Sequence, residues 1–177
     1  MKNLKFSRLF AAVMFVACLV LVGCKPQTEE VTVEKVIIVR PLESDDGIIG
    51  TWVSDWGEKY VITASSVDSS GEGYISYAGD NLVVVMDSET AGRLFIKYTR
   101  ALCNAHSDFE KSIYTYDSDA PDVGKWYAIL YKDLTDNSVK LSGAAGAKTS
   151  CDTLEEAIKT FTVDNGYFAY DSTCIKQ

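Results

Sequence analysis

The sequence predicts a mainly β domain: an antiparallel meander that closes into a small barrel, with one short helix near the C-terminus. Three observations lead to this fold class. Short apolar runs follow one another from residue 48 to 142, with turn residues between them. Several runs alternate with a period of two, as in 93–99, where Leu94, Ile96 and Tyr98 share one face; this spacing is typical of half-buried strands. Amphipathic helical spacing is convincing in one segment, residues 153–160.

The expected strands are joined by short turns and one long loop. Gly79-Asp80-Asn81 is expected to turn the chain between two of them, whereas residues 100–123 break the strand pattern. A loop of that length in a compact domain is often functional. About eight strands in a meander remove their exposed edges by closing into a barrel. The expected strands are 51–56, 59–64, 74–77, 82–86, 93–99, 125–134 and 138–142, with a weak strand and a loop expected in the Ser/Asp/Gly stretch at 65–73.

The helix is predicted by its start signal and its apolar stripe. Asp152 suits the N-cap position, and Glu155 lies three residues later, as in a capping box. Leu154, Ala157, Ile158 and Phe161 follow helical spacing and should pack on the sheet. Residues 167–170 are expected to form a closing strand or a docked tail.

The first 24 residues have the order of a secretory signal. A basic start is followed by an uncharged apolar run over residues 9–22. This run is shorter than the ~20 residues that a transmembrane helix needs. It ends in Leu21-Val22-Gly23-Cys24, which resembles the lipobox of bacterial lipoproteins. The resemblance implies cleavage before Cys24 and acylation of its thiol by chains such as palmitate, so that the lipid on Cys24 anchors the protein to a membrane.

Three regions follow from this interpretation. Residues 1–23 are the signal peptide, 24–47 the lipidated N-terminus and tether, and 48–177 the barrel domain. The expected location is the cell envelope. Lys25 follows the cysteine in place of the Asp that retains many lipoproteins at the inner membrane, which favours the outer membrane.

The charge balance excludes one class of partner. Composition is 47% hydrophobic and 24% charged, which is typical of a globular chain. Three of the 17 basic residues lie in the signal, so 14 remain against 25 acidic residues, a net charge of −11. Nucleic-acid binding needs clustered Lys and Arg, so no nucleic-acid partner is expected.

The cysteines predict one disulfide. Cys103, Cys151 and Cys174 remain beyond Cys24, and export makes disulfides feasible. If 93–99, 125–134 and 138–142 are consecutive antiparallel strands, the first and the third end at the same rim. Cys103 and Cys151 follow those two ends, so we expect a Cys103–Cys151 disulfide with Cys174 as the odd cysteine.

The start of the first strand carries a second resemblance. Gly50-Thr51-Trp52, followed by a meander and a late helix, resembles the lipocalin and calycin group. The resemblance covers most of residues 48–161 and implies a lipocalin-like eight-stranded barrel that holds a small apolar ligand. It also implies that Trp52 packs across the closed end beneath a basic residue, for which Arg93 and Arg100 are candidates. The aromatic candidates for pocket or core are Trp52, Trp56, Tyr98 and Trp126.

Catalytic and metal-binding chemistry have weak support. His106 is the sole histidine, and its proximity to Cys103 in sequence does not make a catalytic pair. These two residues are too few for zinc, which takes three or four protein ligands. Asp117, Asp119 and Asp122 lack the full calcium-loop pattern. We therefore expect no enzyme activity, no metal and no cofactor.

The expected function is that of a lipid-anchored cell-envelope protein that binds a small apolar or amphipathic ligand inside a β-barrel. The alternative is a surface interaction protein with a protein partner and a filled core. An open cavity distinguishes the two, because ligand binding requires space that a filled core does not leave.

Overall fold

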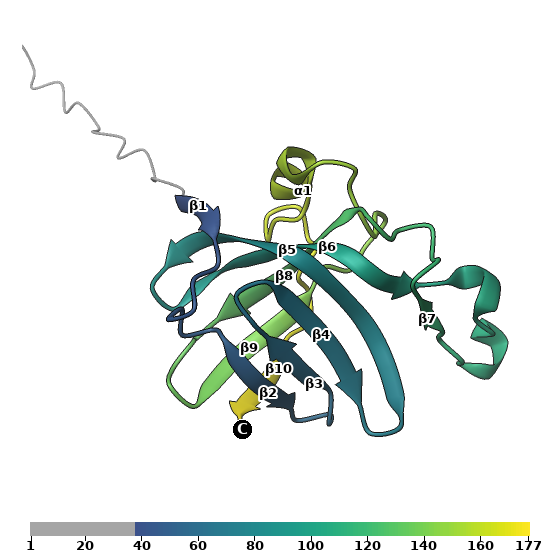
Figure 1. The fold of residues 1–177 in the computed structure, drawn as a ribbon, viewed down its shortest axis with the longest axis horizontal. Helices are drawn as coiled ribbons and strands as arrows, with labels where there is room; N and C mark the ends of the chain where they lie inside the picture. The colour runs from purple at the N-terminus through teal and green to yellow at the C-terminus, as the bar shows by residue number, and fades with distance from the viewer. Residues whose placement is uncertain (1–37) are drawn as a thin grey trace, which may run out of the picture. The chain divides into compact units, whose positions relative to one another are not determined.

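The computed structural model describes residues 38–177, which contain a closed, eight-stranded antiparallel barrel (Figure 1). Neighbouring barrel strands follow the chain, and β10 closes the ring by pairing with both β9 and β2. The predicted fold class is confirmed. The barrel strands are β2 (Gly50–Ser54), β3 (Lys59–Ile62), β4 (Ser66–Gly71), β5 (Tyr74–Ser88), β6 (Ala91–Leu102), β8 (Trp126–Lys132), β9 (Ser138–Gly143) and β10 (Ser172–Lys176).

Two further strands extend the sheet outside the ring. β1 (Ile38–Pro41) pairs with the second half of β5, and β7 (Tyr116–Asp117) pairs with the end of β6. Beyond β1, Leu42 is buried, and Asp46 accepts hydrogen bonds of 2.5 and 2.7 Å from Arg40. Residues 38–47, assigned to the tether from sequence, therefore pack on the barrel. The lipobox lies outside the described residues.

Residues 79–81, where a turn was predicted, are part of the continuous strand β5. Its pairing with β6 shifts register between Asp80 and Val83, and Asn81 has a φ of 54°. This is a β-bulge, which bends the strand and increases its twist without ending it. A Cβ at Gly79 would lie 2.8 Å from the Lys97 carbonyl oxygen, so the close approach of β6 requires glycine there.

The closing strand lies later than residues 167–170. Ser172–Lys176 fills this place, while the Tyr167 ring packs edge-on against Phe161 at 5.1 Å between centroids. In β10, Cys174 is fully buried and Ile175 is half exposed. A strand with one small inward apolar residue gives little alternation in the sequence, which explains why the aromatic run was the stronger signal.

Helix α1 (Leu154–Thr160) lies on the outer face of β6 and β8 (Figure 1). Thr153, not Asp152, is the N-cap, because its hydroxyl accepts a hydrogen bond from the Glu156 backbone N–H. Arg93 reaches from β6 to the other helix end and donates to the Ile158 and Phe161 carbonyl oxygens at 3.0 and 2.9 Å. A cation there also complements the helix dipole. Among residues 38–177, no helix has the length and apolar character to cross a membrane.

One end of the barrel is closed by Trp52. The side chain is fully buried, and its indole N–H donates to the Ile48 carbonyl oxygen at 2.8 Å. The Lys176 ammonium lies 5.0 Å from the ring centroid, so the basic residue over Trp52 is neither of the two expected. Arg93 caps the helix, and Arg100 contacts Asp68 at 3.2 Å.

Candidate functional site

Three tyrosines from neighbouring strands meet at the opposite end of the barrel. Tyr77 comes from β5, Tyr98 from β6 and Tyr127 from β8. The Tyr98 and Tyr127 rings stack with centroids 4.9 Å apart, and Tyr77 meets them edge-on at 6.2 and 5.2 Å. Such pairs add about 0.5–1.5 kcal/mol beyond the burial of their area. The cluster therefore forms a rigid aromatic floor.

The three tyrosine side chains of this floor are buried. Burial raises the pKa of Tyr77 and Tyr98 well above the usual tyrosine value, and it also raises the pKa of Tyr127. All three are therefore neutral at physiological pH. The Tyr77 hydroxyl is buried and has no hydrogen-bond partner among residues 38–177. An unpaired buried hydroxyl costs free energy that a bound polar group would recover.

A cavity of about 390 Å³ opens above the tyrosine floor. This volume is within the range of small-ligand pockets. The wall combines the three rings with small apolar residues and a few polar groups, a composition suited to an amphipathic ligand. Besides the three tyrosines, the lining includes Ala101, Leu102, Asn104, Tyr116, Asp122, Ala144, Ala145, Gly146 and Thr149.

A second cavity of similar volume shares Tyr116 with the first. Its distinctive wall residue is Glu58, in the turn between β2 and β3. The Glu58 carboxylate accepts hydrogen bonds from the Tyr60 hydroxyl at 2.7 Å and from the Ser69 hydroxyl at 2.6 Å. This bonding holds an acidic group at the same rim as the tyrosine cluster.

Asp122 joins two loops at the cavity wall. Its carboxylate accepts hydrogen bonds from Thr149 at 2.7 Å, from Ser150 at 2.8 Å and from the Lys125 ammonium at 3.2 Å. Burial alone would raise the pKa of Asp122, but the hydrogen bonds and the nearby cation outweigh it and lower the pKa. The group is therefore a carboxylate at neutral pH and a fixed acceptor at the mouth.

The structure separates the four predicted aromatic candidates. Trp52 belongs to the core, and Tyr98 lines the cavity. The prediction is wrong for Trp56, which is 82% exposed. Strand β2 ends at Ser54, whose hydroxyl accepts hydrogen bonds from the Trp56 and Glu58 backbone N–H groups. The resulting turn stops the alternation that would have placed Trp56 inside.

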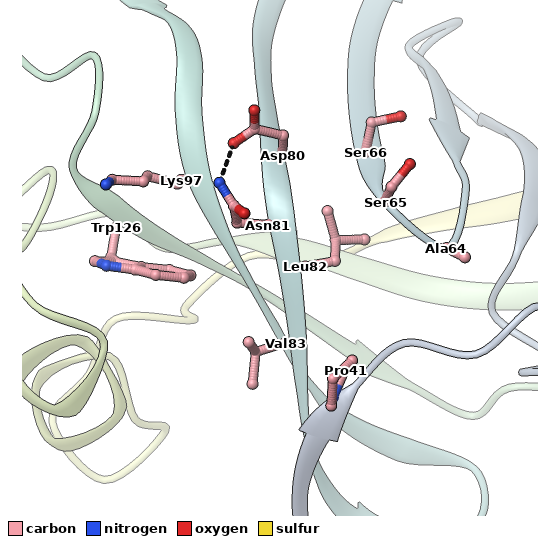
Figure 2. Close-up of a pocket in the computed structure, with 10 residues that line it drawn as sticks. All are labelled: Pro41, Ala64, Ser65, Ser66, Asp80, Asn81, Leu82, Val83, Lys97 and Trp126. Carbon is pink, nitrogen blue, oxygen red and sulfur yellow. Dashed lines mark hydrogen bonds between the residues drawn. The ribbon is translucent and has the colours of Figure 1, made fainter.

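Trp126 lies outside the barrel, in a wide surface groove of about 870 Å³. Figure 2 shows Trp126 beside Lys97 on one side of β5 and Pro41 and the Ala64–Ser66 turn on the other. The groove follows the β5 bulge, where Asn81 donates to Asp80 at 2.8 Å. It is open to solvent, and Trp126 is the one aromatic residue in its lining, in contrast to the tyrosine end.

The long loop projects from the barrel as an arm, residues 103–125 (Figure 1). It contains two 3-10 helices, η1 (Asn104–His106) and η2 (Phe109–Lys111), before β7 returns alongside β6. Within it, the ligand atoms of Cys103, His106, Asp117 and Asp119 all lie within 4.8 Å of one another. His106 Nδ1 and Asp117 Oδ2 are 2.5 Å apart, and this contact raises the pKa of His106.

The predicted Cys103–Cys151 disulfide is wrong: both cysteines are free and buried, as is Cys174. β6 continues to Leu102, whereas Cys151 bridges to Trp126, which lies opposite Lys97 on β6. Cys103 is six residues beyond Lys97, a displacement of about 20 Å at strand rise. A disulfide needs Cα atoms within roughly 7 Å. The predicted strand order is correct, but the extension of β6 carries Cys103 away.

Sequence reasoning missed both Tyr77 and Tyr127 as site residues. Each lies near the first residue of its strand, and an inward-facing tyrosine at a barrel rim is the signal that could have identified both. Comparison of the chain with models of known families, with curated proteins and with solved structures found no match. The fold and the site geometry therefore carry the functional argument.

Proposed function

We propose that the protein is a lipid-anchored cell-envelope protein whose barrel binds a small amphipathic ligand in the tyrosine-floored cavity. The observation that carries this proposal is the cavity of about 390 Å³ over Tyr77, Tyr98 and Tyr127, with the buried Tyr77 hydroxyl unpaired within the described residues. Aromatic faces suit an apolar or aromatic body, and Asn104 and Asp122 offer polar contacts at the wall. The proposal assigns binding and no catalytic step.

Native mass spectrometry tests the ligand. The chain from Lys25 onward, purified from its own envelope, should carry a reproducible extra mass that organic solvent removes. A clean mass that stays unchanged after incubation with envelope lipid extract would contradict the proposal.

A matched pair of variants then locates the ligand. Ala145 is exposed at the cavity wall, and Ala147 is exposed in the same loop outside the wall. Ala145→Trp should fill the mouth and abolish the extra mass, whereas Ala147→Trp should retain it. Equal retention by both variants would show that the ligand binds elsewhere.

The anchor is supported by the Leu21-Val22-Gly23-Cys24 sequence. Metabolic labelling with a palmitate analogue should label the wild-type chain and the Cys18→Ser variant but not Cys24→Ser. The unlabelled variant should also leave the membrane fraction. Because the barrel is strongly acidic, the lipid rather than charge attraction would hold it at an anionic surface. Fractionation of the labelled protein would test the proposed outer-membrane location.

The alternative function, binding of a protein partner, is favoured by the tip of the arm. Phe109, Ile113 and Tyr114 are each about half exposed, and the Phe109 and Tyr114 rings lie 5.7 Å apart. Exposed apolar groups of this kind mark interaction sites. A partner captured by wild-type protein but lost with Phe109→Ser, while the Ala145→Trp variant still binds it, would favour this function over the ligand cavity.

A further inference from the structure

Four side chains with three kinds of donor atom converge in the arm. The set comprises the Cys103 thiol, the His106 imidazole and the carboxylates of Asp117 and Asp119. Their ligand atoms lie within 4.8 Å of one another. Cys103 is only 4% exposed. No hydrogen bond from its sulfur is found within residues 38–177, so a buried thiol is directed into the cluster without a partner of its own.

The backbone fixes these residues from both sides. Ala101 pairs with Asp117 and Leu102 with Tyr116 in the β6–β7 ladder, and the Cys103 N–H donates to the Thr115 carbonyl oxygen at 2.8 Å. The turn after Cys103 is closed by two hydroxyl groups, those of Ser107 and Thr115. The Ser107 hydroxyl donates to the Cys103 carbonyl oxygen, and the Thr115 hydroxyl donates to the His106 carbonyl oxygen, each at 2.8 Å. Strand pairing and turn hydrogen bonds therefore fix the backbone positions of the residues in the cluster.

We propose that Cys103, His106, Asp117 and Asp119 form a binding site for one divalent transition-metal ion, with Zn²⁺ as the best match. Thiolate, imidazole and carboxylate are the three side-chain ligands that zinc takes in proteins. A tetrahedral zinc site places ligand atoms about 3.5 Å apart. The most distant of the four groups therefore need to approach by about 1 Å, whereas His106 Nδ1 and Asp117 Oδ2, now 2.5 Å apart, need to separate by about as much. The ion would replace the present hydrogen bond between His106 and Asp117.

Other uses of the same residues fit less well. Calcium takes oxygen ligands and does not favour a thiol. Asp122, which the sequence places close to Asp117 and Asp119, accepts hydrogen bonds from Thr149 and Ser150 instead. A Cys-His-Asp nucleophile must reach its substrate, whereas Cys103 is buried and the exposed member of the pair is His106. A metal ion needs access for one atom only, and the exposed side of His106 and Asp119 provides it.

Cobalt titration of the full-length chain in detergent tests the site. Co²⁺ reports its ligands optically, and a bound thiolate gives a charge-transfer band. We expect a band that saturates at one Co²⁺ per chain and disappears when Zn²⁺ is added. Elemental analysis after zinc loading and desalting should give one Zn²⁺ per chain. Absence of both the band and the retained zinc would overturn the proposal.

Variants assign the ligands. Cys103→Ser should lose the charge-transfer band, whereas Cys151→Ser, which alters another buried thiol, should keep it. Asp119→Asn alters an exposed turn residue and keeps the shape of its side chain, and it should weaken zinc affinity by at least about tenfold. Glu110→Gln removes an exposed acid from the same arm and should leave the affinity unchanged. A band that persists in Cys103→Ser, or equal affinities of Asp119→Asn and Glu110→Gln, would overturn the assignment. Neither readout depends on the ligand of the barrel.

Discussion

Replacement of Tyr77 by Phe is expected to stabilise the free protein. The Tyr77 side chain is buried, and its hydroxyl has no partner within the described residues. Leaving such a group unpaired costs about 1–3 kcal/mol. Tyr77→Phe removes the oxygen and keeps the ring contacts with Tyr98 and Tyr127. We therefore expect the free energy of unfolding to rise by about 1 kcal/mol, which corresponds to a Tm increase of about 4 °C for a domain of this size.

Tyr60→Phe provides the matched control. Tyr60 is as buried as Tyr77, but its hydroxyl donates to the Glu58 carboxylate at 2.7 Å. Removal of a hydrogen bond to a charged group costs about 1.5–3 kcal/mol, so this variant should lose stability where Tyr77→Phe gains it. Urea denaturation followed by tryptophan fluorescence measures both. If Tyr77→Phe loses stability as Tyr60→Phe does, the Tyr77 hydroxyl has a partner and the reasoning is refuted.

The same variant has a second consequence once a ligand is known. A ligand that pairs with the Tyr77 hydroxyl should bind Tyr77→Phe about tenfold more weakly, equivalent to about 1.4 kcal/mol. If Tyr77→Phe makes the free protein more stable and also weakens ligand binding, the Tyr77 hydroxyl forms a hydrogen bond with the ligand that it lacks in the free protein. Unchanged affinity would place the ligand away from this hydroxyl.

Three further predictions concern the barrel and its loops. Trp52→Ala should cost about 3–5 kcal/mol of unfolding free energy, because its ring is fully buried. Trp56→Ala should change this free energy by less than about 0.5 kcal/mol, because Trp56 is 82% exposed. Equal losses of the two variants in thermal denaturation would contradict the assigned burial. Asp122→Ala should cost about 2 kcal/mol and speed proteolysis between residues 144 and 150, because two hydroxyl donors lose their acceptor; an unchanged cleavage rate would argue against this tie. The hydrogen bond from Arg40 lowers the pKa of Asp46 in the folded protein. The stabilisation that this bond gives the fold is therefore fully present above the ordinary Asp pKa, and it is lost as the pH falls through the lowered pKa of the folded state. Asp46→Asn should thus cost about 1 kcal/mol at pH 7 and less below pH ~3, and a cost that is independent of pH would refute the linkage.

Much of the barrel could be predicted because its strands alternate. Leu94, Ile96 and Tyr98 face inward in β6 as their spacing requires. β5 was divided in two because Gly79-Asp80-Asn81 has turn chemistry, and the same chemistry also makes a bulge. Local sequence does not distinguish the two outcomes, since the difference depends on whether β6 continues alongside.

The candidate site was harder to predict than the strands. Tyr77, Tyr98 and Tyr127 come together only when three strands have a fixed register, and register depends on the bulges of β5. The arm presents the same difficulty. Cys103 and Asp117 become neighbours because the chain reverses at the Asp108–Ile113 bridge and returns as β7. Cys103 and His106 alone are too few ligands for a metal ion, as are Asp117 and Asp119. The pairing of β6 with β7 brings the two pairs together.

The two ends of the barrel differ because of where the long connections leave it. At the Trp52 end the hairpins are short, as between β5 and β6 and between β8 and β9. The two long connections, residues 103–125 and 144–171, both leave from the tyrosine end. Loops on a rigid scaffold tolerate change that the core does not. Changes in these connections would therefore alter the cavity wall without disturbing the packing around Trp52. A metal ion in the arm would act on the same rim, because Asn104 and Tyr116 line the cavity and flank the proposed ligands.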